Sequence, residues 1–259
     1  EKSRGALWYL TALLLFLGAL FSKTAAGTLS AAFLLIVWWK EGRLSWKDVI
    51  PLVPFFVMSA ALGSFTLDLE KRHIAFTGGG EWDFSFAERI LIAGRALWFY
   101  AGKLFWPYPL IFIYPHWEIY ARVLLQWAYP VSAFILLFVL WAMRKRIGRG
   151  PFTATAFFAG VLFPALGFSS FFPMRFSFVA DHFQYLASIG LITGTVFLLT
   201  VLLEKRSFLK MVLAAGLVTF YGILVWKQAL IYTDRETLWR DTLAKNPSAW
   251  LAHNNLGVI

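Results

Sequence analysis

The sequence predicts an all-α membrane protein that crosses a bilayer about seven times and then enters a helical hairpin outside it. Hydrophobic residues make up 59% of the chain and charged residues only 15%, whereas about a quarter of a soluble domain is charged. The apolar residues form blocks of roughly 17–23 residues, and about 20 apolar residues in a helix match the ~30 Å hydrocarbon core. After residue 227 the chain becomes polar and charged.

The predicted spans cover residues 6–21, 28–39, 49–67, 123–143, 152–172, 185–203 and 208–226. The first two are joined by residues 22–27, which leave room only for a tight turn. Pro51 and Pro54 fall in the first turns of the third span, where a helix tolerates proline. Segment 87–105 carries Arg89, Arg95 and Lys103 among its apolar residues. We therefore expect an amphipathic helix that lies at an interface or covers a cavity and does not cross.

The net charge of +10 comes largely from basic residues at the ends of apolar blocks, which argues against a nucleic-acid partner. Basic clusters follow the second, fourth and sixth spans, at 40–47, 144–149 and 205–210. The positive-inside rule places these clusters in the cytoplasm, provided that 87–105 does not cross. Residue 23, residues 68–122, residues 169–184 and the tail then lie outside. Aromatic residues between 98 and 129, Tyr100 and Tyr114 among them, are expected to form a belt there.

The chain contains no cysteine, so it forms no disulfide and fits any redox compartment. It begins with Glu1 and enters an apolar block without a cleavage site, which is typical of a loop between spans and not of a signal peptide. We expect both ends to be cuts and the natural protein to extend beyond them.

The tail, 228–259, is predicted to begin a tetratricopeptide array, whereas 1–227 forms the membrane domain. Residues 233–243 make a charged helix with Leu238, Trp239 and Leu243 as its apolar stripe, 246–248 form a break, and a second helix starts at 249. Such a helical pair is typical of these repeats. Since one repeat cannot bury its own apolar face, further repeats are expected to follow.

The stretch 172–186 combines a cation, a carboxylate, an imidazole and a phenol. If a helix starts near Phe178, Asp181 and Tyr185 share one face, and Arg175 is placed to hold a phosphate with its planar fork. His182 belongs to the same polar group. The alternative is that Arg175 and Asp181 pair with each other at the membrane edge.

Lys23 lies between two apolar blocks, where a lysine either reaches back to water or enters a polar cavity. Arg95 is a candidate for the same cavity. Glu81 and Asp83 follow three glycines; they would bind a divalent cation or act as acid and base, or else form a solvated loop. The histidines lack metal-ligand spacing, so no metal site is predicted.

Three blocks of the sequence resemble one family. They are the Ser22-Lys23-Thr24 segment with its following span, the run Phe172–Gly190, and the Leu-Trp-Arg-Asp, Asn-Pro and Asn-Leu-Gly elements of the tail. They resemble bacterial relatives of the transmembrane-and-tetratricopeptide-repeat O-mannosyltransferases, within the GT-C superfamily of glycosyltransferases. Phe172–Gly190 is the most specific block.

This resemblance implies transfer of a sugar from a polyprenyl-phosphate donor to an extracytoplasmic acceptor at a bacterial inner membrane. Protein hydroxyls would be the acceptors, with the repeats binding acceptor or partner proteins. Arg175, Lys23 and Arg95 would bind the lipid phosphate, and Asp181, His182 and Tyr185 would form the catalytic wall. The resemblance leaves a divalent metal open.

The sequence departs from the family in two ways. The acidic first outer loop of the family would precede Glu1, so the chain alone is expected to be inactive. Thr24 and Ala25 also stand where animal members have Glu and Gln.

Two other functions remain open. One is a non-catalytic, membrane-anchored tetratricopeptide scaffold for protein partners. The other is a transporter or flippase for lipid-linked sugars, which should show pseudo-symmetric halves, but spans 6–67 and 152–226 show no internal repeat.

Overall fold

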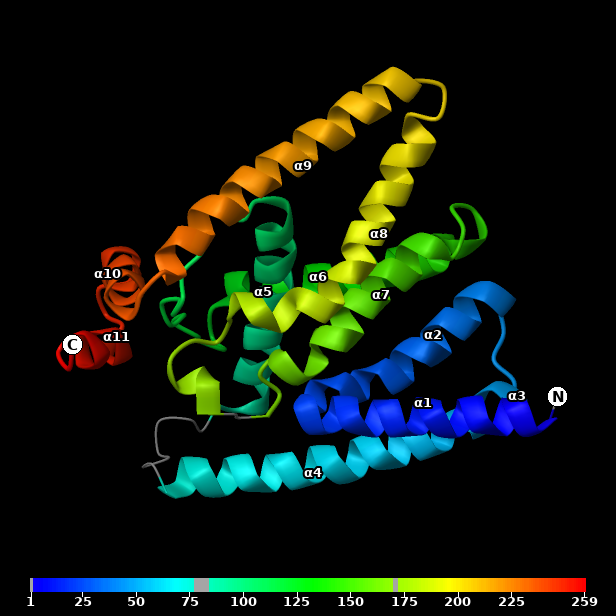
Figure 1. Ribbon diagram of the computed structural model, residues 1–259, viewed down its shortest axis with the longest axis horizontal. Helices are drawn as coiled ribbons and strands as arrows, with labels where there is room; N and C mark the ends of the chain where they lie inside the picture. The colour runs from blue at the N-terminus through cyan, green and yellow to red at the C-terminus, as the bar shows by residue number, and fades with distance from the viewer. Residues whose placement is uncertain (1, 77–83, 170–171) are drawn as a thin grey trace.

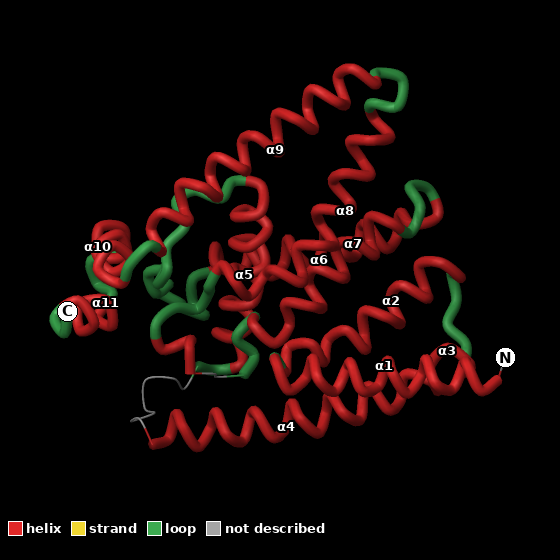
Figure 2. Tube along the Cα trace, viewed as in Figure 1, coloured by secondary structure: helices red, strands yellow, loops and turns green. Residues whose placement is uncertain are grey.

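The computed structural model describes residues 2–76, 84–169 and 172–259, and within them it contains helices and loops but no strand (Figure 2). The predicted all-α class is therefore confirmed. The α-helices are α1 Lys2–Ser22, α2 Leu29–Glu41, α3 Trp46–Val49, α4 Val53–Phe76, α5 Phe86–Phe105, α6 Ala128–Ala142, α7 Gly150–Leu162, α8 Tyr185–Leu202, α9 Ser207–Ala229, α10 Arg235–Lys245 and α11 Trp250–Leu256.

Five helical segments among these residues are long and apolar enough to cross a membrane: Gly5–Ser22, Trp46–Arg72, Leu124–Lys145, Asp181–Leu202 and Ser207–Tyr232. Their apolar side chains face outward, as Leu124 and Leu125 do at 85% and 80% exposure. In the segments that contain α6 and α9, no residue of the most apolar window is buried inside the protein. Exposed apolar surface on this scale requires a lipid environment, which makes the chain a multi-pass membrane protein.

Two predicted spans form α-helices that are shorter than the ~30 Å hydrocarbon core. The block 152–172 does not form one long helix, because α7 ends at Leu162 and passes through a 3-10 turn to Ala165. Pro164 lacks the N–H that would continue the helix, and Gly167 adopts a φ of +88°, which reverses the chain. The helix in block 28–39, α2, has 13 residues and is about 20 Å long. The predicted number of seven crossings remains a prediction.

The loops gather at two ends of the molecule. In Figure 1 the turns that join α2 to α3, α6 to α7 and α8 to α9 lie on one side, and the connection from α9 to α10 and the C-terminal hairpin lie on the other. Two of the basic turns meet directly, since Arg149 Nη1 donates to the carbonyl of Trp39 at 3.2 Å. This is the relative arrangement that the charge pattern predicted.

Helix α5 contributes six buried residues to the core, more than any other helix in the described part of the chain. It runs across the direction of α1 and α4 (Figure 1), and it is not among the candidate spans. Its amphipathic pattern is confirmed, and one face of α5 is buried in the protein core; its position relative to the membrane stays a prediction. Leu91, Ile92 and Ala96 are almost fully buried. Gly94 permits this packing, because a Cβ there would lie 2.5 Å from the backbone nitrogen of Pro130 on α6.

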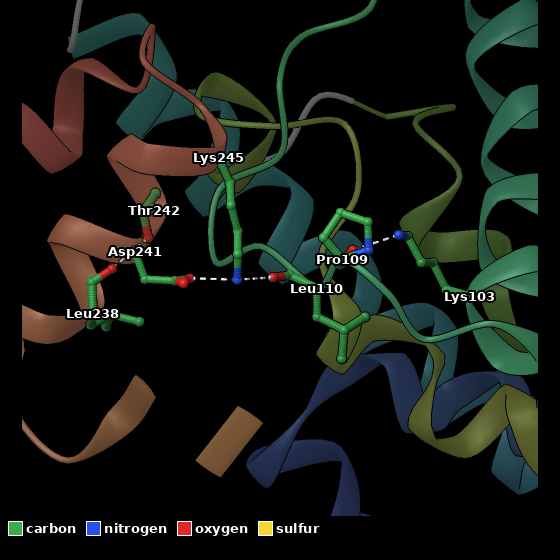
Figure 3. Close-up of polar contacts among 7 residues, drawn as sticks. All are labelled: Lys103, Pro109, Leu110, Leu238, Asp241, Thr242 and Lys245. Atoms are coloured by element: carbon green, nitrogen blue, oxygen red, sulfur yellow. Dashed lines mark hydrogen bonds and ion pairs between the residues drawn. The ribbon is translucent and has the colours of Figure 1, made fainter. Parts of the chain in front are cut away.

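Helices α10 and α11 form the hairpin expected after the membrane domain, with the break at Pro247 where it was predicted. The tetratricopeptide assignment itself stays a prediction. The hairpin does not hang free but packs on the loop that follows α5. Figure 3 shows Lys245 Nζ between the Asp241 carboxylate at 2.8 Å and the Leu110 carbonyl at 3.1 Å. Buried Asn246 donates from Nδ2 to the Ile113 carbonyl at 3.0 Å.

The two ends of the molecule are expected to face opposite sides of the membrane. Because the chain lacks cysteine, Ser207→Cys and Tyr108→Cys each introduce one thiol at an exposed position at one end. A membrane-impermeant maleimide should label Tyr108→Cys from outside intact cells and Ser207→Cys only after permeabilisation. Labelling of both from the same side would contradict this topology.

Asn246→Ala should release the hairpin from the loop after α5. The change leaves the buried Ile113 carbonyl without its donor, which costs about 1–3 kcal/mol. Hydrogen exchange across 235–256 should therefore quicken while exchange in α8 stays unchanged. The matched control is Asn254→Ala, an exposed asparagine on α11, which should leave exchange as it is. Equal exchange in the two variants would show that Asn246 does not hold the hairpin.

Candidate active site

Asp181 begins a short 3-10 turn, Asp181–Gln184, immediately before α8. The condition of a helix start near Phe178 is not met, because α8 starts at Tyr185, the first residue of the predicted span 185–203. Ser177 explains part of the difference: its hydroxyl donates to the carbonyl of Val179 at 2.8 Å, a local bond that competes with helix formation. Consequently Asp181 and Tyr185 do not share the face of one α-helix, and Tyr185 is 72% exposed.

Tyr114 holds the Asp181 carboxylate. Its hydroxyl donates to Oδ1 of Asp181 at 2.8 Å, and its side chain is only 4% exposed. Burial raises the pKa of the Tyr114 phenol above its ordinary value, and the neighbouring carboxylate raises it further. Tyr114 therefore remains a neutral donor to a partly buried carboxylate at physiological pH.

Lys103 is the basic residue whose positive charge acts on the Asp181 carboxylate. Its ammonium lies 5.7 Å from the ring centroid of Tyr114 and donates to the carbonyl of Pro109, as Figure 3 shows. Burial lowers the pKa of Lys103, whereas the charge of Asp181 opposes that shift. The lysine thus offsets part of the cost of burying the carboxylate.

Tyr100 fixes the backbone beside the carboxylate. It is fully buried, and its hydroxyl accepts a hydrogen bond from the backbone N–H of Ala180 at 3.1 Å. Burial raises the pKa of Tyr100, so it too stays neutral. Tyr100 and Tyr114 were both expected in an exposed aromatic belt, which is wrong for these two residues because their hydroxyls have partners inside the protein.

His182 and Lys23 both lie close to the ring of Phe183. The imidazole of His182 packs at 4.4 Å, centroid to centroid, against Phe183. The Lys23 ammonium lies 5.8 Å from the same ring. Lys23 sits in the turn between α1 and the 3-10 helix Thr24–Thr28, as the short linker predicted. This places Lys23 beside the turn that carries Asp181.

Arg95 lies against aromatic rings near the site. Its guanidinium lies 4.6 Å from the Trp117 centroid and 5.9 Å from that of Tyr129. Within the described part of the chain it has no hydrogen bond or ion pair. Phe99, which contacts both Trp117 and Tyr114, stands between Arg95 and the carboxylate.

Arg175 is not paired with Asp181 in the described residues. Its guanidinium lies 5.3 Å from the ring of Trp250 on α11, and its carbonyl meets His116 Nε2 at 3.2 Å. The structure therefore brings Lys23 close to His182 at the Phe183 ring, in the turn that also carries Asp181, and places Arg175 at the contact with the hairpin.

Glu81 and Asp83 lie outside the described residues. Among the described ones, no group of three histidines or carboxylates is arranged to hold a metal ion. What the site offers chemically is one carboxylate with a tyrosine donor and a lysine nearby, suited to accept a proton from a hydroxyl.

Sequence reasoning missed Lys103, Tyr100 and Tyr114. Lys103 was noticed only as a charge on an amphipathic helix, and its position three residues after Tyr100 is the signal that both face one side of α5. Tyr114 gave no local signal, because 67 residues separate it from Asp181.

Tyr114→Phe should destabilise the protein by about 1.5–3 kcal/mol, since it removes the donor to a partly buried carboxylate. Thermal unfolding in detergent, combined with Asp181→Asn in a double-mutant cycle, measures the coupling. Tyr108→Phe is the control, because that ring is 64% exposed. Strictly additive effects of the two site variants would contradict the interaction.

Comparison with protein-family models, with curated proteins and with solved structures found no match to this chain. The resemblance of the blocks around Lys23, Phe172–Gly190 and the tail therefore stays a prediction.

Proposed function

We propose that this protein belongs to a membrane glycosyltransferase of the GT-C type, which moves a sugar from a polyprenyl-phosphate donor to an extracytoplasmic acceptor. Protein hydroxyls are the proposed acceptors. One observation carries the proposal: the carboxylate of Asp181, held by Tyr114 beside Lys103, belongs to the sequence run that most resembles that family.

Asp181 is the proposed general base. It would accept the proton of the acceptor hydroxyl as the bond between that oxygen and the sugar forms. The bond between the sugar and the donor phosphate breaks, and the polyprenyl phosphate leaves with the electron pair. Tyr114 keeps the carboxylate in position, and its own proton stays in place because burial raises its pKa.

Lys23 and Arg95 are the proposed cations for the donor phosphate. Neither forms an ion pair with a carboxylate of the described residues, so both charges remain available to an anionic ligand. Lys23 lies against Phe183, next to the proposed base. His182 would line the same side of the site. Tyr185, which is exposed, and Arg175, which lies at the hairpin, would meet the acceptor.

The surroundings support a lipid-linked donor. The outward-facing apolar helices suit a substrate whose polyprenyl tail stays in the bilayer while its phosphate reaches the protein. We place the site and the hairpin on the extracytoplasmic side of a bacterial inner membrane, opposite the basic turns.

A non-catalytic scaffold is the second candidate. The observation that favours it is the firm docking of α10 and α11 through Lys245 and Asn246, which would present a repeat array to protein partners at a fixed orientation. In that case the contacts of Asp181 would serve only to stabilise the fold.

Asp181→Asn should lower sugar transfer by about a hundredfold or more, the usual contribution of a general base. Transfer from a radiolabelled polyprenyl-phosphate sugar is measured in membranes that contain the full-length protein. Glu118→Gln removes an exposed carboxylate of the outer loop and should keep full activity. Lys23→Gln should raise KM for the donor more than it lowers kcat. Equal transfer by Asp181→Asn and the parent would refute the assignment, and no transfer by the parent would favour the scaffold.

A further inference from the structure

A groove of tryptophans and cations lies at the end of the molecule opposite Asp181. It has a volume of about 740 Å³ and is formed by the end of α2 and the turn between α6 and α7. The side chains that matter here are Trp38, Trp39, Trp141, Arg144, Lys145 and Arg149. No carboxylate belongs to its lining, so no negative charge of the lining repels an anion that enters the groove.

Arg149 is fixed in this groove by the end of α2. Its Nη1 donates to the carbonyl of Trp39 at 3.2 Å, where the negative end of the helix dipole also attracts it. Gly42 makes room for the guanidinium: it adopts a φ of +75°, and a Cβ there would lie 2.0 Å from Arg149 Nη2. Gly42 therefore ends α2 and leaves the space that the Arg149 guanidinium occupies.

Arg144 is held in a similar way. Its guanidinium lies 4.0 Å from the ring centroid of Trp141, and Nη1 donates to the carbonyl of the same residue at 2.7 Å. A guanidinium has five N–H donors, and the described residues supply no carboxylate to the others of either arginine. The guanidinium groups of Arg144 and Arg149, each partly buried and held in place, therefore have N–H donors available for a ligand.

The indole groups indicate where the groove lies in the bilayer. Trp39 and Trp141 are about half exposed, and the indole N–H groups of the three tryptophans have no hydrogen-bond partner among the described residues. Tryptophan prefers the headgroup level, where its ring meets apolar chains and its N–H meets polar groups. The basic turns at this end also favour anionic lipid.

We propose that this groove binds the phosphate headgroup of an anionic phospholipid. Arg144 and Arg149 donate to the phosphate oxygens, Lys145 adds a third charge at the rim, and the indoles contact the glycerol region. This site is separate from Asp181 and does not depend on the proposed transferase activity.

The test uses purified protein in neutral detergent and native mass spectrometry with short-chain phosphatidylglycerol, phosphatidylcholine or inorganic phosphate. Phosphatidylglycerol should bind, and Arg144→Gln with Arg149→Gln should weaken it by about 25-fold, or about fivefold for each charge. The matched control, Lys205→Gln with Arg206→Gln, removes two exposed charges from the turn between α8 and α9 and should keep the affinity. Lys145→Gln, whose side chain is exposed, should weaken binding about fivefold and covers the case in which the double variant fails to fold.

Three outcomes would overturn the proposal. One is equal weakening in the control, because it would mean general attraction by a basic surface. Another is equal binding of phosphatidylcholine. The last is binding of inorganic phosphate as tight as that of phosphatidylglycerol, which would make the groove a site for free phosphate.

Discussion

The close contact between α5 and α6 at Gly94 determines where the polar groups of this protein meet. With the Pro130 backbone so near that a Cβ at residue 94 would clash, α5 is drawn into the core and buries Leu91 and Ala96. The same helix then presents Tyr100 and Lys103 to the segment before α8. Packing between two backbones thus places a hydroxyl and an ammonium beside Asp181.

A charged helix inside a membrane protein is stable only if its polar groups find partners. Arg89 donates to the Gly167 carbonyl at 3.0 Å, Lys103 donates to Pro109, and Arg95 lies against Trp117. Each partner belongs to a loop at one end of the bundle. The polar side chains of α5 therefore tie those loops together, and the loops in turn order the turn that carries Asp181.

The fold could be predicted where the signal is local. Apolar blocks specified the helices because burial in lipid depends on composition over about 20 residues. The prediction failed after α7, where Pro164 and Gly167 end the helix although the block stays apolar. The partners of the α5 charges could not be predicted either, since they belong to distant loops that no local pattern reveals.

The candidate site shows the same division between local and distant signals. Asp181, His182 and Lys23 stand in recognisable blocks, and Lys23 lies close to the turn that carries the other two. Tyr114 reaches Asp181 across 67 positions, and only the folded chain reveals this contact. Arg175 could not be placed from sequence, because its neighbour Trp250 belongs to the hairpin.

The two ends of the molecule are linked by a tightly packed pair of helices. A Cβ at Gly190 on α8 would lie 2.5 Å from the Ala154 carbonyl on α7, so the two backbones approach as closely as small residues allow. α7 begins one residue after Arg149 of the groove, and α8 begins four residues after Asp181. Because α7 and α8 cannot slide past each other without a clash at Gly190, a headgroup held at one end and the carboxylate at the other share one rigid frame. A lipid in the groove would then fix the depth at which that carboxylate meets a donor carried in the same bilayer.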